Sequence, residues 1–168
     1  MRPNDETADL DAHYIEGYAV AAMRAGRSGQ FTVPLVSHIE GNLWMGGCRD
    51  GVRLPDDFRF VVSLYPWEKY TLGPNTHREE FELYDDEQIP DPRVLAGIAE
   101  RINVYRHAGR TLVHCQAGLN RSGLVIALAL ITEGLAPAAA IDLLRTRRTP
   151  VVLCNAVFEH WLLERGGE

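Results

Sequence analysis

The stretch VHCQAGLNRSG, residues 113–123, carries most of what this chain reveals about its function. It places Cys115 at the end of a short apolar segment, followed by a turn, Arg121 and a second apolar run. Such a turn can curl its backbone N–H groups around one centre, and a following helix adds the positive end of its dipole. Arg121 can fork two donors onto a tetrahedral oxyanion. We therefore predict a loop that holds a phosphate group over the Cys115 sulfur.

The same positive field acts on the thiol of Cys115. Cysteines at helix N-termini or beside cationic groups ionise more readily than free cysteine, so Cys115 is predicted to be a nucleophile at neutral pH. His114 can orient the loop by bonding its backbone. The Ser122 hydroxyl can donate to the sulfur when the sulfur becomes the leaving group. Both residues are expected to support the reaction rather than to attack the substrate.

Length and composition indicate one domain. The chain has 168 residues, 46% of them hydrophobic and 24% charged, as in ordinary globular proteins. Its net charge of −6 gives no general attraction to nucleic acid or anionic membranes. The apolar runs are too short for a membrane helix, and the acidic first residues lack the apolar core of a signal peptide. We expect a soluble cytoplasmic protein with no membrane partner.

The other chemically active side chains are scattered. Three cysteines without a CxxC pair favour a reducing compartment over a disulfide framework. Cys48 is either a packing residue or a protective disulfide partner of Cys115, and Cys154 is expected to be structural. A group of arginines either braces the loop, binds substrate charge or ends a solvated helix: Arg145, Arg147 and Arg148. No metal and no cofactor are predicted, because five histidines lack metal-ligand spacing: His13, His38, His77, His107 and His160.

Alternating strand and helix signals predict an α/β fold, a sheet covered by helices. Segments rich in β-formers predict strands over residues 33–39, 42–45, 58–65, 79–84 and 111–115. Apolar periodicity and capping residues predict helices over residues 6–25, 92–108, 137–145 and 155–163. Residues 124–131 suit a strand or a buried helix by apolar content, and their length and flanks favour a helix.

The motif resembles the cysteine-dependent protein tyrosine phosphatase superfamily, whose active-site loop reads HCxxGxxR followed by Ser or Thr. Every specified place is filled: His114, Cys115, Gly118, Arg121 and Ser122. The resemblance continues from about residue 37 to the C-terminus, where SHIEGNLWMGG and the last helices are similar to dual-specificity phosphatases. It implies a central mixed sheet flanked by helices. Residues 31–168 would form the phosphatase domain, and residues 1–30 a helical extension and linker that packs on the domain or recognises a partner or substrate.

The resemblance also implies roles for the site residues. Cys115 would attack phosphorus to form a cysteinyl-phosphate. The transferring group would be stabilised by the loop: Gln116, Ala117, Gly118, Leu119, Asn120 and Arg121. An aspartate about 30 residues earlier would protonate the leaving oxygen. Asp85 and Asp86 both suit that spacing, and the pattern Asp-x-x-x-Pro-Asp, similar to cyclin-dependent-kinase-associated members, favours Asp86.

Family resemblance implies a phosphorylated protein as substrate, with phosphotyrosine and also phosphoserine or phosphothreonine accepted. The alternative is an RNA 5′-triphosphatase, because Asn120 precedes Arg121 as in the mRNA-capping group, although Ala117 stands where that group has a second histidine. A phosphoinositide phosphatase would be expected to carry lysines in the loop, where Gln116 and Leu119 are neutral. A phosphate-binding module without catalysis would be expected to lack the cysteine or the arginine.

Overall fold

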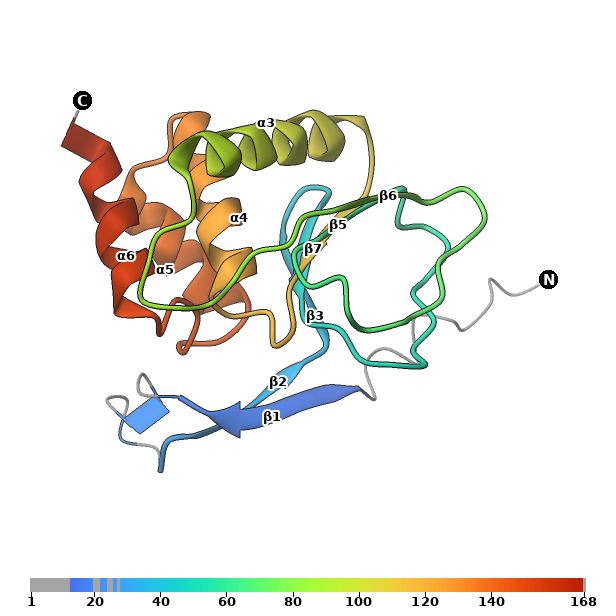
Figure 1. Ribbon diagram of the computed structural model, residues 1–168, viewed down its shortest axis with the longest axis horizontal. Coiled ribbons are helices and arrows are strands. Elements are labelled where there is room, and N and C mark those ends of the chain that lie inside the picture. The colour runs from blue at the N-terminus through green and yellow to red at the C-terminus, as the bar shows by residue number, and fades with distance from the viewer. Residues whose placement is uncertain (1–12, 20–21, 24–25, 27, 168) are drawn as a thin grey trace.

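The computed structural model describes residues 13–19, 22–23, 26 and 28–167, and its centre is a five-stranded sheet (Figure 1). The strands lie in the order β3-β4-β7-β5-β6. β3 and β4 are antiparallel, whereas β4, β7, β5 and β6 run parallel to one another, so the sheet is mixed as predicted. The strand bounds are Val36–Glu40 for β3, Leu43–Gly46 for β4, Phe60–Ser63 for β5, His77–Glu80 for β6 and Thr111–His114 for β7.

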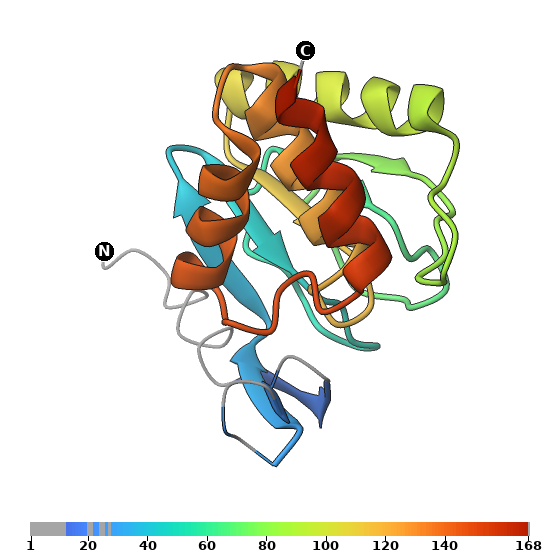
Figure 2. The same cartoon turned by 90° about the vertical axis from the view of Figure 1, so that its left-hand side faces the viewer.

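The two faces of this sheet are covered by different parts of the chain. Successive strand residues point to opposite faces. On β5 and β7, Val62 and Val113 pack against the helices, whereas Val61 and Leu112 join a second cluster with residues of the connection between β4 and β5. The helices therefore gather on one face, as Figures 1 and 2 show, and the long connection covers the other.

Four helices cover the first face: α3, Pro92–Ala108; α4, Arg121–Thr132; α5, Pro137–Arg147; and α6, Ala156–Leu163, followed by the short turn η1, Glu164–Gly167. Asp91 caps α3 by accepting from the Arg93 amide at 2.9 Å, and Asn155 caps α6 by accepting from the Val157 amide at 3.1 Å. These caps confirm the helix starts expected from the sequence. Within the described part of the chain, no helix is both long and apolar enough to span a bilayer.

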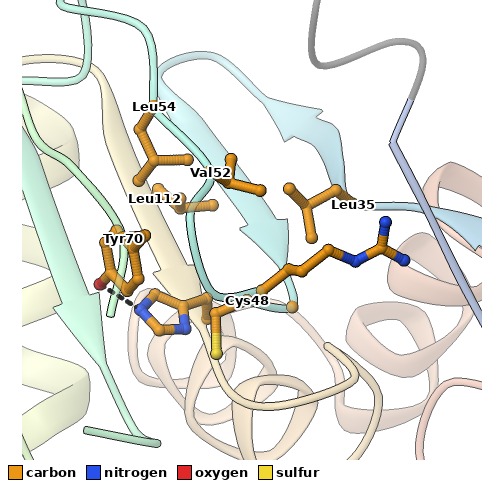
Figure 3. Close-up of a pocket in the computed structure, with 9 residues that line it drawn as sticks. Leu35, Cys48, Val52, Leu54, Tyr70 and Leu112 are labelled. Atoms are coloured by element: carbon orange, nitrogen blue, oxygen red, sulfur yellow. Dashed lines mark hydrogen bonds between the residues drawn. The ribbon is translucent and has the colours of Figure 1, made fainter. Parts of the chain in front are cut away.

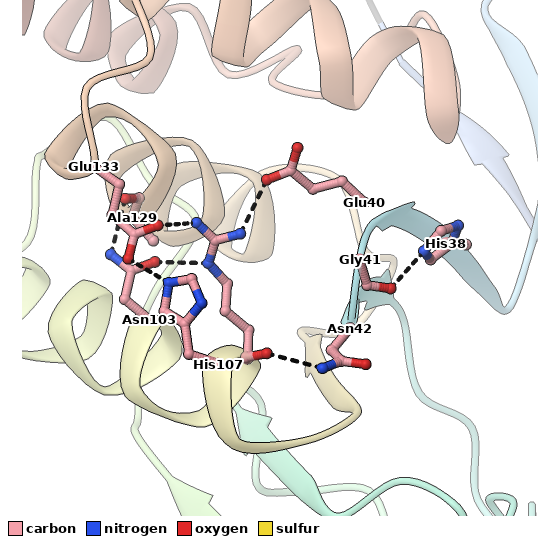
Figure 4. A network of polar contacts seen from close by, with 9 residues as sticks. His38, Glu40, Gly41, Asn42, Asn103, His107, Ala129 and Glu133 are labelled. Carbon is pink, nitrogen blue, oxygen red and sulfur yellow. Dashed lines mark hydrogen bonds and ion pairs between the residues drawn. The ribbon is translucent and has the colours of Figure 1, made fainter.

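A largely buried arginine ties two of these helices to the sheet (Figure 4). The Arg106 guanidinium, on α3, donates to the Glu40 carboxylate at 2.9 Å and to the Asn103 side-chain oxygen at 2.9 Å. It also pairs with Glu133, which accepts from His107 as well, at 2.7 Å. Glu40 ends β3 and Glu133 follows α4, so the network fixes α3 and α4 against the β3–β4 turn.

The prediction of a helix over residues 6–25 is wrong at residues 14–18, although Ala22 and Met23 are helical. β1, Tyr14–Tyr18, pairs antiparallel with β2, Gln30–Pro34, in a separate two-stranded sheet. The spacing of four between Tyr14 and Tyr18 suggested a helix, but residues four apart share a face in a strand as well. The rest of the expected helical pattern, Leu10 and Ala21, lies outside the described residues.

A glycine makes the hairpin possible. Gly17 lies opposite Phe31, and a Cβ at position 17 would lie 2.9 Å from the Phe31 ring. The absent side chain lets the buried Phe31 pack against β1, while the same glycine weakens a helix. The hairpin joins residues on both sides of the expected boundary at residue 30, and we propose that it is part of the phosphatase domain.

Two strand predictions also change in detail. The segment over residues 33–39 is divided between two sheets, because the chain turns at Leu35 from β2 into β3. The strand expected over residues 79–84 is β6, which ends at Glu80. Its partner β5 ends at Ser63, whose carbonyl accepts from the Phe81 amide as the last bond of the ladder. Beyond Phe81 the chain has no strand to pair with, and it leaves the sheet.

Candidate active site

The predicted phosphate loop lies between β7 and α4, with the Cys115 side chain at its base. Cys115 is 2% exposed, and its amide donates to the Gly46 carbonyl of β4 at 3.2 Å. Two groups approach its sulfur: the Gly118 amide donates to Sγ at 3.3 Å, and the Ser122 Oγ lies 3.3 Å from Sγ. The Ser122 hydroxyl therefore lies within hydrogen-bonding distance of the sulfur.

The four loop carbonyls that follow Cys115 all point outward, each accepting a hydrogen bond from the surrounding structure. The pairs are Cys48 N–H to Gln116 O at 3.0 Å, Arg148 Nη2 to Ala117 O at 3.1 Å, Arg148 Nε to Gly118 O at 2.7 Å and Leu153 N–H to Leu119 O at 3.1 Å. With its carbonyls tied outward, the loop turns its N–H groups inward. Such a ring of amides binds an anion.

Arg148 is the main brace of this ring. Besides its two loop carbonyls, its Nη1 donates to the Pro34 carbonyl at 2.9 Å and to the Ser37 hydroxyl at 3.0 Å. Burial lowers the pKa of Arg148 to about 10, which leaves the guanidinium charged at neutral pH. Gly118 fits beneath it only as glycine, because its φ is +72° and a Cβ there would lie 2.4 Å from the Gly46 carbonyl carbon.

Replacing Arg148 is expected to loosen the loop without touching the sulfur. Arg148→Met removes four hydrogen bonds, two of them buried, so we expect about 3 kcal/mol less stability and about tenfold lower phosphatase kcat/KM, chiefly through a higher KM. Arg147→Met, at the exposed neighbouring position that ends α5, is the matched control. Urea unfolding and steady-state kinetics measure both. Equal behaviour of the two variants would remove Arg148 from the loop's support.

Arg121 borders the cleft and keeps a spare hydrogen-bond donor. Its Nη1 donates to the Leu83 carbonyl at 3.2 Å, and its guanidinium lies 5.1 Å from the centre of the Tyr65 ring. The side chain is buried, with the residue 8% exposed, and its Nε has no hydrogen-bond partner among the described residues. A buried N–H without an acceptor is costly unless a ligand supplies one. This donor fits the expected phosphate contact.

The two neighbouring aspartates lie in different places. Asp85 borders the cleft over Cys115 and Arg121, while Asp86 borders a neighbouring hollow with Gln88. The Asp85 carboxylate accepts from the Asn120 amide at 2.8 Å and from the Asn155 amide at 2.8 Å. The Asp86 carboxylate accepts from the Gln88 backbone at 2.7 Å. The placement favours Asp85, whereas the sequence pattern favoured Asp86.

His114 faces away from the cleft and steadies the loop from behind. Its Nδ1 lies 3.1 Å from the Cys115 carbonyl oxygen, and its Nε2 lies 2.5 Å from the Tyr70 hydroxyl (Figure 3). A carbonyl only accepts, so Nδ1 carries the proton and Nε2 accepts from Tyr70. Burial lowers the pKa of His114 to about 4 and raises that of Tyr70 to about 12, so both are neutral at pH 7.

The depressed pKa of His114 makes stability depend on pH. The unfolded chain binds this proton below about pH 6.5 and the folded chain only near pH 4, so stability falls as the pH drops between those values. His114→Asn keeps a donor for the Cys115 carbonyl but removes the titrating ring. We expect the loss of unfolding free energy between pH 7 and pH 4.5 to shrink by about 2 kcal/mol in the variant. Identical pH dependence in urea unfolding would contradict a buried neutral imidazole.

The other two cysteines lie at opposite edges of the loop. Cys48 donates its amide to the loop, as described above, and its thiol pKa is raised by burial and by the nearby Glu68 carboxylate. Cys154 borders the cleft, and its sulfur lies 3.4 Å from the Asn120 side-chain nitrogen. All three cysteines are free thiols. No group of three His, Cys, Asp or Glu side chains within the described ranges is arranged to hold a metal ion.

The cleft has a second wall that sequence reasoning did not place there. The cleft measures about 280 Å³, and the loop borders it on one side, together with Asp85 and Cys154. Asn120 is the loop residue beside them. The other side is the N-terminal hairpin: Ile15, Glu16, Gly17, Tyr18, Ala19 and Phe31. No sequence motif indicates the roles of Tyr70, of Asn155 as a partner of Asp85, or of the hairpin. Folding brings each of them to the site from a distant part of the chain.

The comparisons with known proteins agree with this geometry. The family of dual specificity phosphatase catalytic domains matches residues 93–167. Mouse receptor-type tyrosine-protein phosphatase C is 27% identical over 96 residues, which cover 55% of this chain and 7% of that protein. Arabidopsis thaliana PTEN1, named a phosphatidylinositol 3,4,5-trisphosphate 3-phosphatase and protein-tyrosine-phosphatase, is 26% identical over 145 residues, 84% of this chain and 33% of that protein. The chain therefore spans a third or less of these relatives.

Solved structures show the same fold. Human DUSP28 superposes with a TM-score of 0.67 at 19% identity, covering 77% of this chain and 94% of that one. DUSP15 gives a TM-score of 0.66 at 19% identity, covering 79% and 87%. These structures show that the chain has a dual-specificity-phosphatase-like fold. The family match over residues 93–167 agrees with the resemblance of the loop motif to the cysteine-dependent protein tyrosine phosphatase superfamily.

Proposed function

We propose that this protein hydrolyses phosphate monoesters on protein side chains through a cysteinyl-phosphate on Cys115. The observation that carries the proposal is the combination of a buried sulfur, a ring of inward amides and the spare Nε of Arg121. Together these groups form a site for a tetrahedral dianion directly above a nucleophile. The family match to residues 93–167, which include the whole loop, supports the same reaction class.

The first step transfers the phosphoryl group to sulfur. The Cys115 thiolate attacks phosphorus, the S–P bond forms and the bond from phosphorus to the substrate oxygen breaks. Arg121 and the loop amides stabilise the charge on the transferring group. Asp85 gives its proton to the departing oxygen, which leaves as an alcohol.

The second step returns the enzyme to its starting state. The ionised Asp85 takes a proton from water, the water oxygen attacks phosphorus and the S–P bond breaks. Inorganic phosphate leaves, and Ser122 stabilises the thiolate by a hydrogen bond across the 3.3 Å between Oγ and Sγ. The same carboxyl thus acts as acid and then as base.

Asp85 is proposed for this role in place of Asp86 because of its position in the cleft. Asn120 and Asn155 hold its carboxylate from the loop and from the cap of α6. Both partners are neutral amides. We regard these two asparagines as positioning residues.

Phosphotyrosine, with phosphoserine and phosphothreonine, is the proposed substrate class, in a reducing cytoplasm where Cys115 is not oxidised. The name of the Arabidopsis relative includes a phosphoinositide activity. The loop positions Gln116, Leu119 and Asn120 are neutral here, however, and offer no added cation to a polyphosphorylated headgroup. The net charge of −6 likewise disfavours the RNA 5′-triphosphatase alternative, because an acidic protein has no general attraction to RNA.

Phosphate release from four substrates, measured side by side in EDTA, tests the proposal. They are a phosphotyrosyl peptide, a phosphoseryl peptide, a soluble phosphoinositide headgroup and a triphosphate-ended RNA. We expect both peptides to be hydrolysed, with the phosphotyrosyl peptide faster. Turnover of RNA or of the headgroup alone would overturn the protein-phosphatase proposal, and turnover of none would leave a phosphate-binding module.

A further inference from the structure

One strand of the N-terminal hairpin borders the catalytic cleft along its edge. Five consecutive residues, from Ile15 through Ala19, line the cleft over Cys115, whereas β2 contributes Phe31 alone. Side chains of a strand alternate between two faces, so a run of consecutive lining residues means that the backbone edge faces the cleft. Figures 1 and 2 show β1 and β2 as a separate ribbon beneath the main domain.

The hydrogen-bond pattern shows which backbone groups that edge presents. The Leu35 amide donates to the His13 carbonyl at 2.8 Å, and the Ala19 amide donates to the Gly29 carbonyl at 2.6 Å. Bonded pairs recur every second residue in an antiparallel ladder. Odd-numbered residues of β1 therefore bond to β2, and the N–H and C=O groups of Glu16 and Tyr18 point the other way.

These edge groups are unpaired within the described part of the chain. None of the described residues bonds the backbone of Glu16 or Tyr18 on this side. The neighbouring Tyr14 carbonyl shows that the edge accepts donors, because it takes one from Arg49. A strand edge with free donors and acceptors is a template for another strand.

The edge is held at a fixed place relative to the loop. The Ile15 side chain packs over Gly47 and leaves no room for a Cβ there. Arg148 binds the Pro34 carbonyl at the end of β2 with the same guanidinium that braces Ala117 and Gly118. One side chain therefore couples the hairpin to the phosphate site.

We propose that the free edge of β1 binds an extended segment of the phosphorylated protein as a third strand of the hairpin. The phosphorylated side chain of that segment points toward the domain and enters the loop at Cys115. Main-chain bonds to Glu16 and Tyr18 supply affinity that depends little on sequence, as in other additions of a peptide to a sheet edge. This inference rests on the proposed protein-phosphatase function and names the form of its substrate, an extended phosphopeptide.

A backbone N-methyl scan of a phosphotyrosyl peptide tests the added strand. Alternate amides of a bound strand face β1, so methylation should lower kcat/KM by about threefold or more at every second position and leave the positions between nearly unchanged. A small aryl phosphate provides the reference rate. A flat scan, or losses without a period of two, would overturn the proposal while aryl phosphate turnover shows that the catalytic site works.

Two proline variants test the same edge from the protein side. Glu16→Pro removes an N–H that points into the cleft and takes no part in the hairpin ladder. Thr32→Pro makes the same change on β2, where residue 32 lies opposite Glu16 and its N–H points away from β1. We expect the ratio of peptide to aryl phosphate kcat/KM to fall about fivefold in Glu16→Pro and to stay unchanged in Thr32→Pro.

A third variant separates the backbone from the side chain. Glu16→Ala keeps the edge N–H and removes the carboxylate, so its ratio should stay close to that of the wild type. A ratio that falls equally in Glu16→Ala and Glu16→Pro would assign the effect to the side chain and contradict strand addition. If the wild-type enzyme does not hydrolyse the aryl phosphate at all, the result would instead count against the proposed function itself.

Discussion

Cys115→Ser is expected to abolish turnover of phosphotyrosyl peptide, with a loss of at least about 10⁴-fold in kcat. A serine hydroxyl is a far weaker nucleophile than a cysteine sulfur, because an alcohol stays protonated at neutral pH and sulfur is intrinsically the more nucleophilic atom. The remaining phosphate site, with Arg121 and the loop amides, is unchanged. Binding of the peptide should therefore survive although hydrolysis does not.

Calorimetric titration with the phosphotyrosyl peptide measures whether Cys115→Ser still binds the peptide that it no longer hydrolyses. The control is Cys154→Ser, which alters a thiol at the edge of the same cleft, outside the proposed chemistry. We expect that variant to keep most of its activity. Residual turnover in Cys115→Ser comparable to the wild type would remove Cys115 as the nucleophile, and loss of binding together with turnover would indicate a collapsed loop.

Asp85→Asn is expected to lower kcat/KM for the phosphoseryl peptide by about 10² to 10⁴, the usual worth of a general acid. The loss should be much smaller for an aryl phosphate whose leaving group is a weak base, because such an oxygen departs without a proton. This dependence on the leaving group distinguishes an acid from a residue that only positions the loop. Stopped-time phosphate assays on both substrates provide the comparison.

Asp86→Asn is the matched control, one residue along the chain and in a neighbouring hollow. It should change neither rate by more than a few fold. If Asp86→Asn shows the steep dependence on the leaving group and Asp85→Asn does not, the acid is Asp86, as the Asp-x-x-x-Pro-Asp pattern suggested.

The parts of the fold that the sequence predicted correctly are those determined locally. The Cys115 loop joins a strand to a helix within a few residues, so its motif and its geometry are read from the same stretch. The caps Asp91 and Asn155 act on amides two residues away. Their side chains determine where α3 and α6 begin without help from distant parts of the chain.

The features that escaped prediction depend on contacts between distant segments. Tyr14 and Tyr18 have a helix-compatible spacing, and they lie in a strand because β2 pairs with them. Arg148 was one of three arginines near a helix end, and its role comes from carbonyls about 30 residues earlier in the chain. Asp85 and Asp86 differ by one residue, and the course of the chain after β6 determines which carboxylate borders the cleft.

The most direct test of the proposed chemistry is to trap the intermediate. The enzyme is mixed with excess phosphotyrosyl peptide, quenched in acid within milliseconds and digested, and the peptide that contains Cys115 is weighed by mass spectrometry. The expected result is the added mass of one phosphoryl group on Cys115, absent in Cys115→Ser and formed at the rate of the first turnover. Phosphate release at full rate with no phosphorylated cysteine at any quench time would contradict the two-step mechanism.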